Sequence, residues 1–116
     1  MSLTLYGIGH CDTVKRARAW LALQGAVVQF HDFKKAGVPE LALDGWIAAV
    51  GWQRLINRQG STWRQLSAAT QAAVLDAASA RAVMQAHSSV IKRPVVAWPD
   101  GAITVGFDAA EFSRRL

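Results

Sequence analysis

The sequence predicts an α/β fold with a four-stranded mixed sheet and helices around it. Three observations support this prediction: a strand, helix and strand in close succession at the start, a purely helical middle, and a β-hairpin followed by a helix at the end. The chain has 116 residues, of which 52% are hydrophobic and 18% charged. This length and composition are typical of one globular domain, which we expect to span residues 1–116.

The first part of the chain has the pattern of a βαβ unit. Residues 3–6 alternate weakly between apolar and polar and end at Gly7, which predicts a strand entering a turn. A helix is expected over residues 11–24, with Gly25 as its stop, and a second strand over residues 27–33. So compact an order favours two parallel strands joined by a right-handed crossover.

The middle of the chain, at about residues 39–88, predicts a helical insertion. Apolar residues recur there at helical spacing in several short segments, the first of which begins at Pro39 and ends at Gly51. Serine is a favoured N-cap residue, because its hydroxyl accepts a hydrogen bond from a free N–H of the first turn. The expected N-caps are Ser61, Ser67 and Ser79.

The last part of the chain predicts a hairpin and a closing helix. Two β-rich runs, 95–98 and 102–105, flank a Pro-Asp-Gly turn at 99–101. In the closing helix we expect Asp108 as the N-cap, Glu111 in the capping-box position, and Phe112 and Leu116 on the inward face. Together these elements outline a thioredoxin-like fold.

Charge and hydropathy narrow the functional classes. The formal charge is +5, but the basic residues are scattered apart from a tight group at Lys15, Arg16 and Arg18. This distribution favours a small anionic ligand over a nucleic acid. No apolar run approaches the ~18 residues that span a bilayer, and the N-terminus lacks a signal-peptide layout. We expect a cytoplasmic, monomeric protein without a membrane contact.

Cys11 is the only cysteine, and it follows directly on the first strand and turn. A CxxC redox or zinc motif is excluded because Val14 stands where the second sulfur would be. The histidines have no ligand-like spacing, so no metal site is expected. Any redox chemistry must therefore take its second thiol from another molecule.

A thiol at a helix N-terminus is favoured in its charged form by the exposed N–H groups and the helix dipole. Lys15 follows one turn later and His10 precedes Cys11, whereas Asp12 opposes the thiolate. A lone cysteine after a strand is otherwise often a small buried hydrophobic residue. The polar flanks count against burial, but local chemistry leaves both interpretations open.

Two further segments are candidate anion sites. In IKRPVV, residues 91–96, a cis Pro94 would leave the preceding backbone able to pair with a peptide-like ligand, and Arg93 offers a planar fork for an oxyanion. In NRQGSTWRQL, residues 57–66, Arg58 and Arg64 flank a glycine-containing loop. The alternatives are an ordinary edge-strand proline and arginines that face solvent.

The chain resembles the arsenate reductase-like (ArsC) family, most closely its YffB subgroup, which is related to the Spx regulators. The resemblance rests on LYGIGHCDTVKRARAWL, GWQRLINRQGSTWRQL, and IKRPVVAW with VGF, and it covers essentially the whole chain. It implies a thioredoxin-like sheet with a helical insertion, Cys11 as the nucleophile, and a cis Pro94 facing it.

In glutathione-linked arsenate reductases the cysteine attacks the oxyanion, glutathione attacks the adduct, and glutaredoxin resolves the mixed disulfide. The resemblance implies that three arginines hold the anion. One matches Arg93, a second falls at Asn57 or Arg58, and the third falls at Gly106 and Phe107, which carry no charge.

The missing third arginine favours a glutathione-dependent thiol reductase over an arsenate reductase. Its expected binding residues are Arg93, Pro94, Arg58, Lys15 and His10, its co-substrate is glutathione, and its substrate is a small oxyanion or disulfide. The rival hypothesis is a regulator like Spx that docks on RNA polymerase. Spx-type proteins often carry a CxxC switch, which Val14 removes here.

Overall fold

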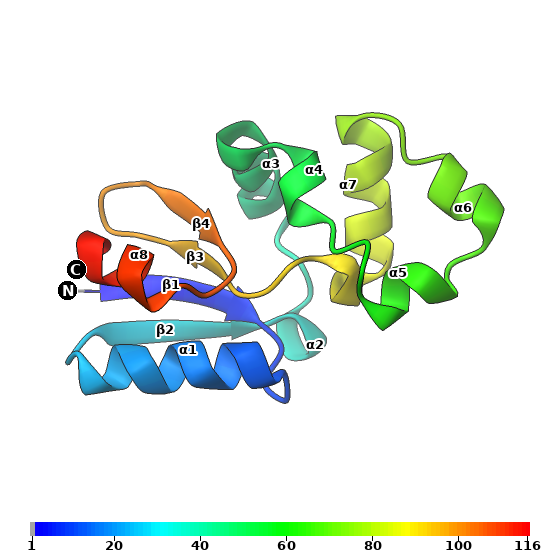
Figure 1. Cartoon of the computed structure of the whole chain (residues 1–116). Helices are drawn as coiled ribbons and strands as arrows, with labels where there is room; N and C mark the ends of the chain where they lie inside the picture. Colours follow the sequence, from blue (N-terminus) through cyan, green and yellow to red (C-terminus); the bar gives the residue numbers. More distant parts are fainter. Residues whose placement is uncertain (1) are drawn as a thin grey trace. The chain divides into compact units, whose positions relative to one another are not determined.

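The computed structural model describes residues 2–116 and contains one four-stranded mixed sheet. The strands β1 (Ser2–Gly7), β2 (Val27–Asp32), β3 (Val95–Ala97) and β4 (Ile103–Val105) lie in the order β2-β1-β3-β4 (Figure 1). β1 pairs with β2 in parallel and with β3 antiparallel, and β3 and β4 form the predicted hairpin. This α/β arrangement is the thioredoxin-like fold that the sequence predicts.

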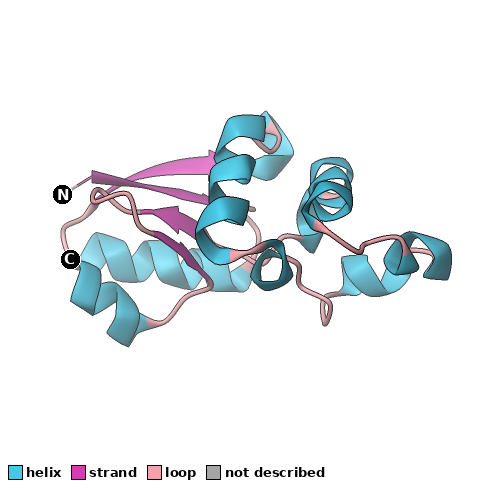
Figure 2. Cartoon of the chain, turned by 90° about the horizontal axis from the view of Figure 1, so that it is seen from above, coloured by secondary structure: helices cyan, strands magenta, loops and turns pink. Residues whose placement is uncertain are grey.

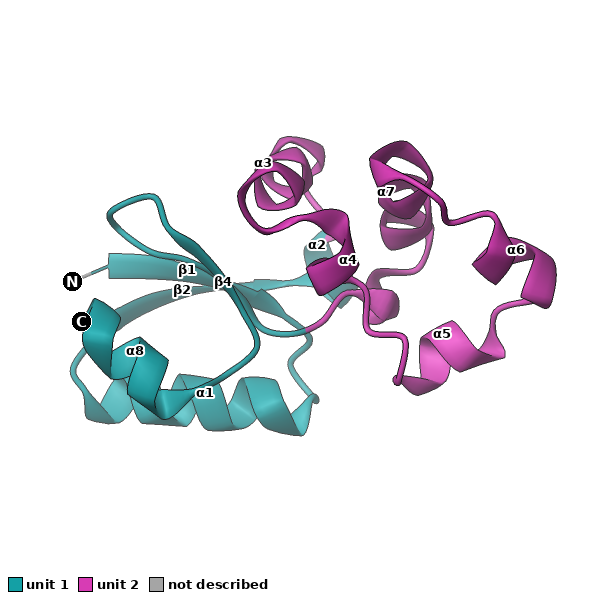
Figure 3. Ribbon diagram, turned by 45° about the horizontal axis from the view of Figure 1, so that its top comes forward, with its two compact units in different colours: residues 1–36, 93–116 teal, residues 37–92 magenta. Residues whose placement is uncertain are grey.

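The chain divides into two compact units (Figure 3). Unit 1 contains the residues up to Ala36 and Arg93–Leu116, and therefore holds the whole sheet. Unit 2 is Gly37–Lys92, and the predicted helical insertion at 39–88 falls inside it. The expectation of one domain over residues 1–116 stays a prediction.

In unit 1 the sheet is accompanied by α1 (Asp12–Leu23), α2 (Phe33–Ala36) and α8 (Ala109–Arg115) (Figure 2). α1 and α8 pack on the same sheet face, because apolar residues of both helices join one core with alternate residues of β1 and β3. The buried members of this core are Leu3, Leu5, Val14, Ala17, Leu21, Val96, Trp98 and Phe112.

The aromatic rings of Trp98, Phe107 and Phe112 pack together where α8 meets the core. The Phe112 ring lies edge-on to the rings of Trp98 and Phe107, at centroid distances of 5.0 and 5.1 Å. The Trp98 indole N–H donates a 2.9 Å hydrogen bond to the Thr104 hydroxyl, which satisfies the polar atoms of both buried side chains. The cluster thereby fixes α8 and the hairpin against each other.

Unit 2 consists of short helices: α3 (Glu40–Val50), α4 (Trp52–Leu55), α5 (Ser61–Gln65), α6 (Ala68–Ala72), α7 (Ala77–Ala86) and the 3₁₀ helix η1 (Ser88–Val90). An isolated antiparallel bridge joins Ile56 to Ile91. Within residues 2–116 no helix has both the length and the apolarity to cross a membrane.

Several predicted helix ends are confirmed. Gly25 and Gly51 have positive φ angles of 74° and 86° at the ends of α1 and α3, where a side chain would be strained. Ser67 caps α6 by accepting a hydrogen bond from the Thr70 N–H, and Asp108 caps α8.

Other details of the prediction are wrong. The N-cap of α7 is Asp76, and Ser79 is its capping-box partner three residues later, because the Asp76 carboxylate accepts from the Ser79 N–H. Ser61 begins α5, with Gly60 as the N-cap. Leu116 is exposed rather than inward, since α8 ends at Arg115.

A close approach between Gly7, the last residue of β1, and Val14 in α1 generates a stability prediction. A Cβ at Gly7 would lie 2.7 Å from the Val14 Cγ2, and Val14 is fully buried and β-branched, so it has no easy way to move. We expect Gly7→Ala to lower the free energy of unfolding by about 1–3 kcal/mol in urea denaturation.

Gly45→Ala is the matched control. Gly45 lies inside α3, and a Cβ there would meet nothing within 4 Å. We expect this variant to raise the free energy of unfolding by about 0.5–1 kcal/mol through helix propensity alone. Equal effects of the two substitutions would contradict the steric explanation.

Candidate active site

Cys11 stands between the turn after β1 and the first turn of α1. Its N–H donates a 3.1 Å hydrogen bond to the Ile8 carbonyl, and its own carbonyl accepts from the Lys15 N–H at 2.9 Å. It is the N-cap residue of α1 and has extended backbone angles. The side chain is partly exposed, so Cys11 is neither sealed in the core nor fully solvated.

The surroundings of Cys11 favour its thiolate. Partial burial raises the pKa of the Cys11 thiol, but the N–H groups of Val14 and Thr13 and the guanidinium of Arg93 outweigh it, so the net pKa lies below that of a free cysteine. The N–H groups at the start of α1 thus favour the charged form of the sulfur over the neutral thiol.

Arg93 reaches Cys11 from the far end of the sequence because β3 pairs directly with β1. Tyr6, close before Cys11, lies opposite Val95, close after Arg93. The peptide bond between Arg93 and Pro94 is cis, as the family resemblance implies, and Pro94 is buried. The Pro94 carbonyl accepts a 2.8 Å hydrogen bond from the Gly106 N–H.

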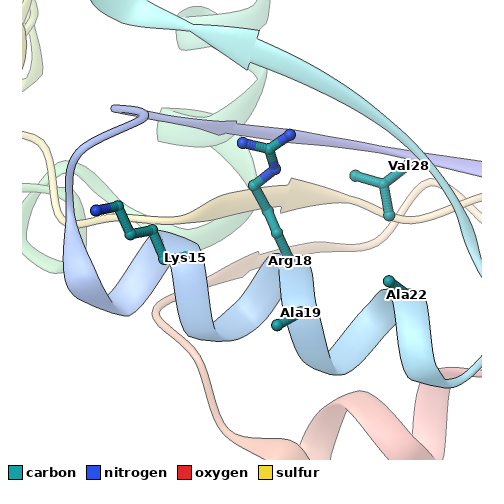
Figure 4. A pocket seen from close by; sticks show the side chains of 5 residues that line it. All are labelled: Lys15, Arg18, Ala19, Ala22 and Val28. Carbon is teal, nitrogen blue, oxygen red and sulfur yellow. The ribbon is translucent and has the colours of Figure 1, made fainter.

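The other predicted binding residues of unit 1 are exposed. His10 lies in the turn directly before Cys11. Lys15 lines a pocket of about 390 Å³ together with Arg18, Ala19, Ala22 and Val28. Figure 4 shows Lys15 and Arg18 projecting from α1, with the two alanines farther along the helix and Val28 on β2. This pocket combines two cations with an apolar lining.

Arg58, the remaining predicted binding residue, belongs to unit 2. It lies after α4, and its guanidinium is 5.3 Å from the centroid of the Trp63 ring. Asn57, the alternative match to the second arginine, precedes it in the same loop. Their part in binding at Cys11 stays a prediction.

Two side-chain contacts in unit 1 were not predicted from the sequence. The Arg18 guanidinium lies 4.0 Å from the centroid of the Phe30 ring on β2, a cation–π contact that holds it over the sheet edge. The Asp32 carboxylate, at the end of β2, lies 3.2 Å from where a Cβ at Gly9 would be. Gly7 pairs with Asp32 in the parallel register of β1 and β2, and this pairing places the carboxylate beside the turn before Cys11. A prediction of that register would have been needed to find it.

Known proteins match this sequence over almost its whole length. A protein of Haemophilus influenzae described as uncharacterized is 34% identical over 114 residues, which are 98% of both chains. Among solved structures, the YffB protein PA3664 is 42% identical with a TM-score of 0.92 over 98% of both chains.

A second solved structure is an arsenate reductase (ArsC) related protein from Brucella melitensis. It is 45% identical with a TM-score of 0.76, and the match covers 98% of this chain and 93% of the other. The sequence pattern that defines the ArsC family matches residues 6–114. This range contains Cys11, Arg93 and the cis proline, and the chain therefore belongs to the ArsC family.

Proposed function

We propose that this protein is a glutathione-dependent thiol reductase in which Cys11 is the nucleophile. The observation that carries the proposal is the placement of a partly exposed thiol at the start of α1 beside Arg93, where its pKa is lowered. Membership of the ArsC family supports a function of the thiol-reductase type. The similarity to a protein described as arsenate reductase-related points in the same direction.

In the proposed reaction the Cys11 thiolate attacks one sulfur of a disulfide substrate. The substrate S–S bond breaks, a mixed disulfide forms with Cys11, and the departing thiolate takes up a proton from solvent. Because this chain carries one cysteine, no internal thiol can resolve the mixed disulfide. Glutathione thiolate then attacks the substrate sulfur of the adduct, which releases Cys11 and leaves the substrate joined to glutathione.

A second glutathione completes the reduction. Its thiolate attacks the disulfide between substrate and glutathione, so the substrate leaves as a thiol and glutathione disulfide forms. Two glutathione molecules thereby supply the two electrons. In the alternative order, glutathione thiolate attacks the Cys11 sulfur and the substrate leaves as a thiol. A glutaredoxin thiolate then attacks the glutathione sulfur of this adduct, which releases Cys11 and leaves glutathione joined to glutaredoxin.

The predicted binding residues of unit 1 each have a specific part in this proposal. Arg93 stabilises the Cys11 thiolate and also offers its planar fork to a carboxylate of glutathione. Lys15 adds positive charge to the pocket on α1. Pro94 and His10, which adjoin Arg93 and Cys11 in the sequence, are assigned contacts with the peptide of glutathione.

We prefer disulfide reduction to arsenate reduction as the proposed activity because the region around Phe107 carries no arginine. The family resemblance puts a third anion-binding arginine there, but Phe107 packs against the rings of Trp20 and Phe112. A guanidinium lost from an anion clamp removes a charge-assisted hydrogen bond worth about 1.5–3 kcal/mol. A disulfide substrate develops no polyanionic transition state, so it loses less by this absence.

The first prediction from this proposed function concerns the ionisation of Cys11. The alkylation rate with iodoacetamide follows the thiolate fraction, so its midpoint against pH reports the pKa of the thiol. We expect a midpoint below that of free glutathione measured alongside. Arg93→Gln removes a cation that stabilises the thiolate, so it is expected to move the midpoint to higher pH.

Arg114→Gln is the matched control for this titration. Arg114 belongs to the same unit and is exposed on α8, so its loss changes the net charge equally. We expect its midpoint to coincide with that of the unsubstituted protein. A midpoint above that of glutathione in the unsubstituted protein would refute an activated thiol.

The second prediction concerns the glutathione adduct. Mass spectrometry after incubation with glutathione disulfide should detect one glutathione on Cys11, and none on Cys11→Ser. We expect Arg93→Gln to slow adduct formation about tenfold, since it loses a charge-assisted contact worth roughly 1.4 kcal/mol or more. Arg114→Gln should form the adduct at the unaltered rate.

The dependence on glutathione is tested separately with a small model disulfide. Turnover should rise with glutathione concentration and cease in Cys11→Ser. Failure to form any adduct, together with no glutathione-dependent turnover, would overturn the proposed function. A stable complex with RNA polymerase in that case would favour the regulatory alternative.

A further inference from the structure

Unit 2 contains a pocket of its own that is lined almost entirely by cations and amides. Its volume is about 330 Å³, within the range of small-molecule sites. The charged lining residues are Arg54, Arg58 and Lys92, and the remaining lining residues are Gln53, Ile56, Asn57 and Gln59. All of them belong to unit 2.

Backbone pairing brings Lys92 to the two arginines, which are far from it in the sequence. The isolated bridge between Ile56 and Ile91 aligns the segment after α4 with the segment after η1. The Lys92 N–H donates to the Leu55 carbonyl at 2.7 Å, and the Asn57 N–H donates to the Val90 carbonyl at 2.8 Å. Leu55, Val90 and Ile91 are fully buried, so the pocket stands on a packed base.

The loop that carries Arg58 is also ordered. The Asn57 carboxamide oxygen accepts from the Gln59 N–H at 3.2 Å, and the Asn57 carbonyl accepts from the Gly60 N–H at 3.3 Å. Arg58 itself lies over the Trp63 ring. A guanidinium held in this way loses less conformational entropy when it binds an anion.

The negative charge of unit 2 lies outside this pocket. Its acidic residues are Glu40, Asp44 and Asp76, and none of them lines the pocket. Asp44 accepts a 2.6 Å hydrogen bond from Arg81, and Asp76 caps α7. Three cations therefore face the pocket without an acidic residue in its lining.

We propose that this pocket binds the phosphate or diphosphate group of a small molecule. Two planar guanidinium groups and an ammonium group match a tetrahedral anion that carries two or more charges. The carboxamide N–H groups of Gln53, Asn57 and Gln59 can donate to the remaining oxygens. The lining contains no aromatic side chain.

Arg58 is also a predicted glutathione-binding residue, whereas Arg54 and Lys92 have no part in the reaction proposed for Cys11. The test therefore uses a background in which the Cys11 site is disabled, the double variant Cys11→Ser, Arg93→Gln. Inorganic pyrophosphate is titrated into this protein, labelled with ¹⁵N, at constant ionic strength. Single Cys11→Ser serves as a second background should the double variant fold poorly.

We expect saturable shifts of the arginine Nε–H signals of Arg54 and Arg58 and of the amide N–H signals of Asn57, Gln59 and Lys92. Arg54→Gln and Lys92→Gln should each raise the Kd for pyrophosphate at least about fivefold, corresponding to ~1 kcal/mol per surface charge contact. Arg64→Gln, which removes an exposed charge of unit 2 outside the pocket, should change it less than twofold.

Three outcomes would overturn the proposal. They are the absence of saturable pyrophosphate binding, shifts that map away from the lining residues, and an equal loss of affinity in Arg64→Gln. Succinate at the same ionic strength tests the chemical class. Binding of succinate as tight as that of pyrophosphate would exclude a phosphate-specific site.

Discussion

The contact between Gly7 and Val14 is the constraint on which the candidate active site depends. With no side chain at Gly7, α1 can begin directly against the end of β1, and Val14 fills the space that a Cβ would need. The turn from Ile8 to Cys11 then places the cysteine as the N-cap of the helix. A larger separation between the end of β1 and the start of α1 would move the sulfur away from the N–H groups of the first helical turn. The close packing of Gly7 against Val14 thus also determines where the Cys11 sulfur lies at the start of α1.

Cys11 illustrates two opposing electrostatic effects. Partial burial disfavours the thiolate, while the N–H groups of α1 and the Arg93 guanidinium stabilise it and prevail. The stabilising groups come from two directions, one along the helix and one across the sheet from β3. Arg93 lies just before β3, and the pairing of β3 with β1 within one unit brings the segment that carries it close to Cys11.

The sequence was sufficient to predict the parallel βαβ unit, the hairpin and the position of Cys11 at a helix start, because these follow from glycine positions and hydrophobic period. It was insufficient where two residues compete for one local role. Asp76 and Ser79 are three residues apart and each is a good N-cap, and only the start of the helix decides that Asp76 takes the role. The Asp32 carboxylate beside Gly9 was missed because it depends on strand register, which local pattern does not fix.

The grouping of the basic residues in space likewise could not be predicted from local sequence pattern. Along the chain they look scattered, yet a single bridge between Ile56 and Ile91 gathers Arg54, Arg58 and Lys92 around one pocket. Lys15 and Arg18 share another pocket through helical spacing, without Arg16 between them. Each group contains two or three cations around a small volume, whereas a polyanion needs a continuous basic stripe. This distribution fits the small anionic ligands proposed above better than it fits a polyanion.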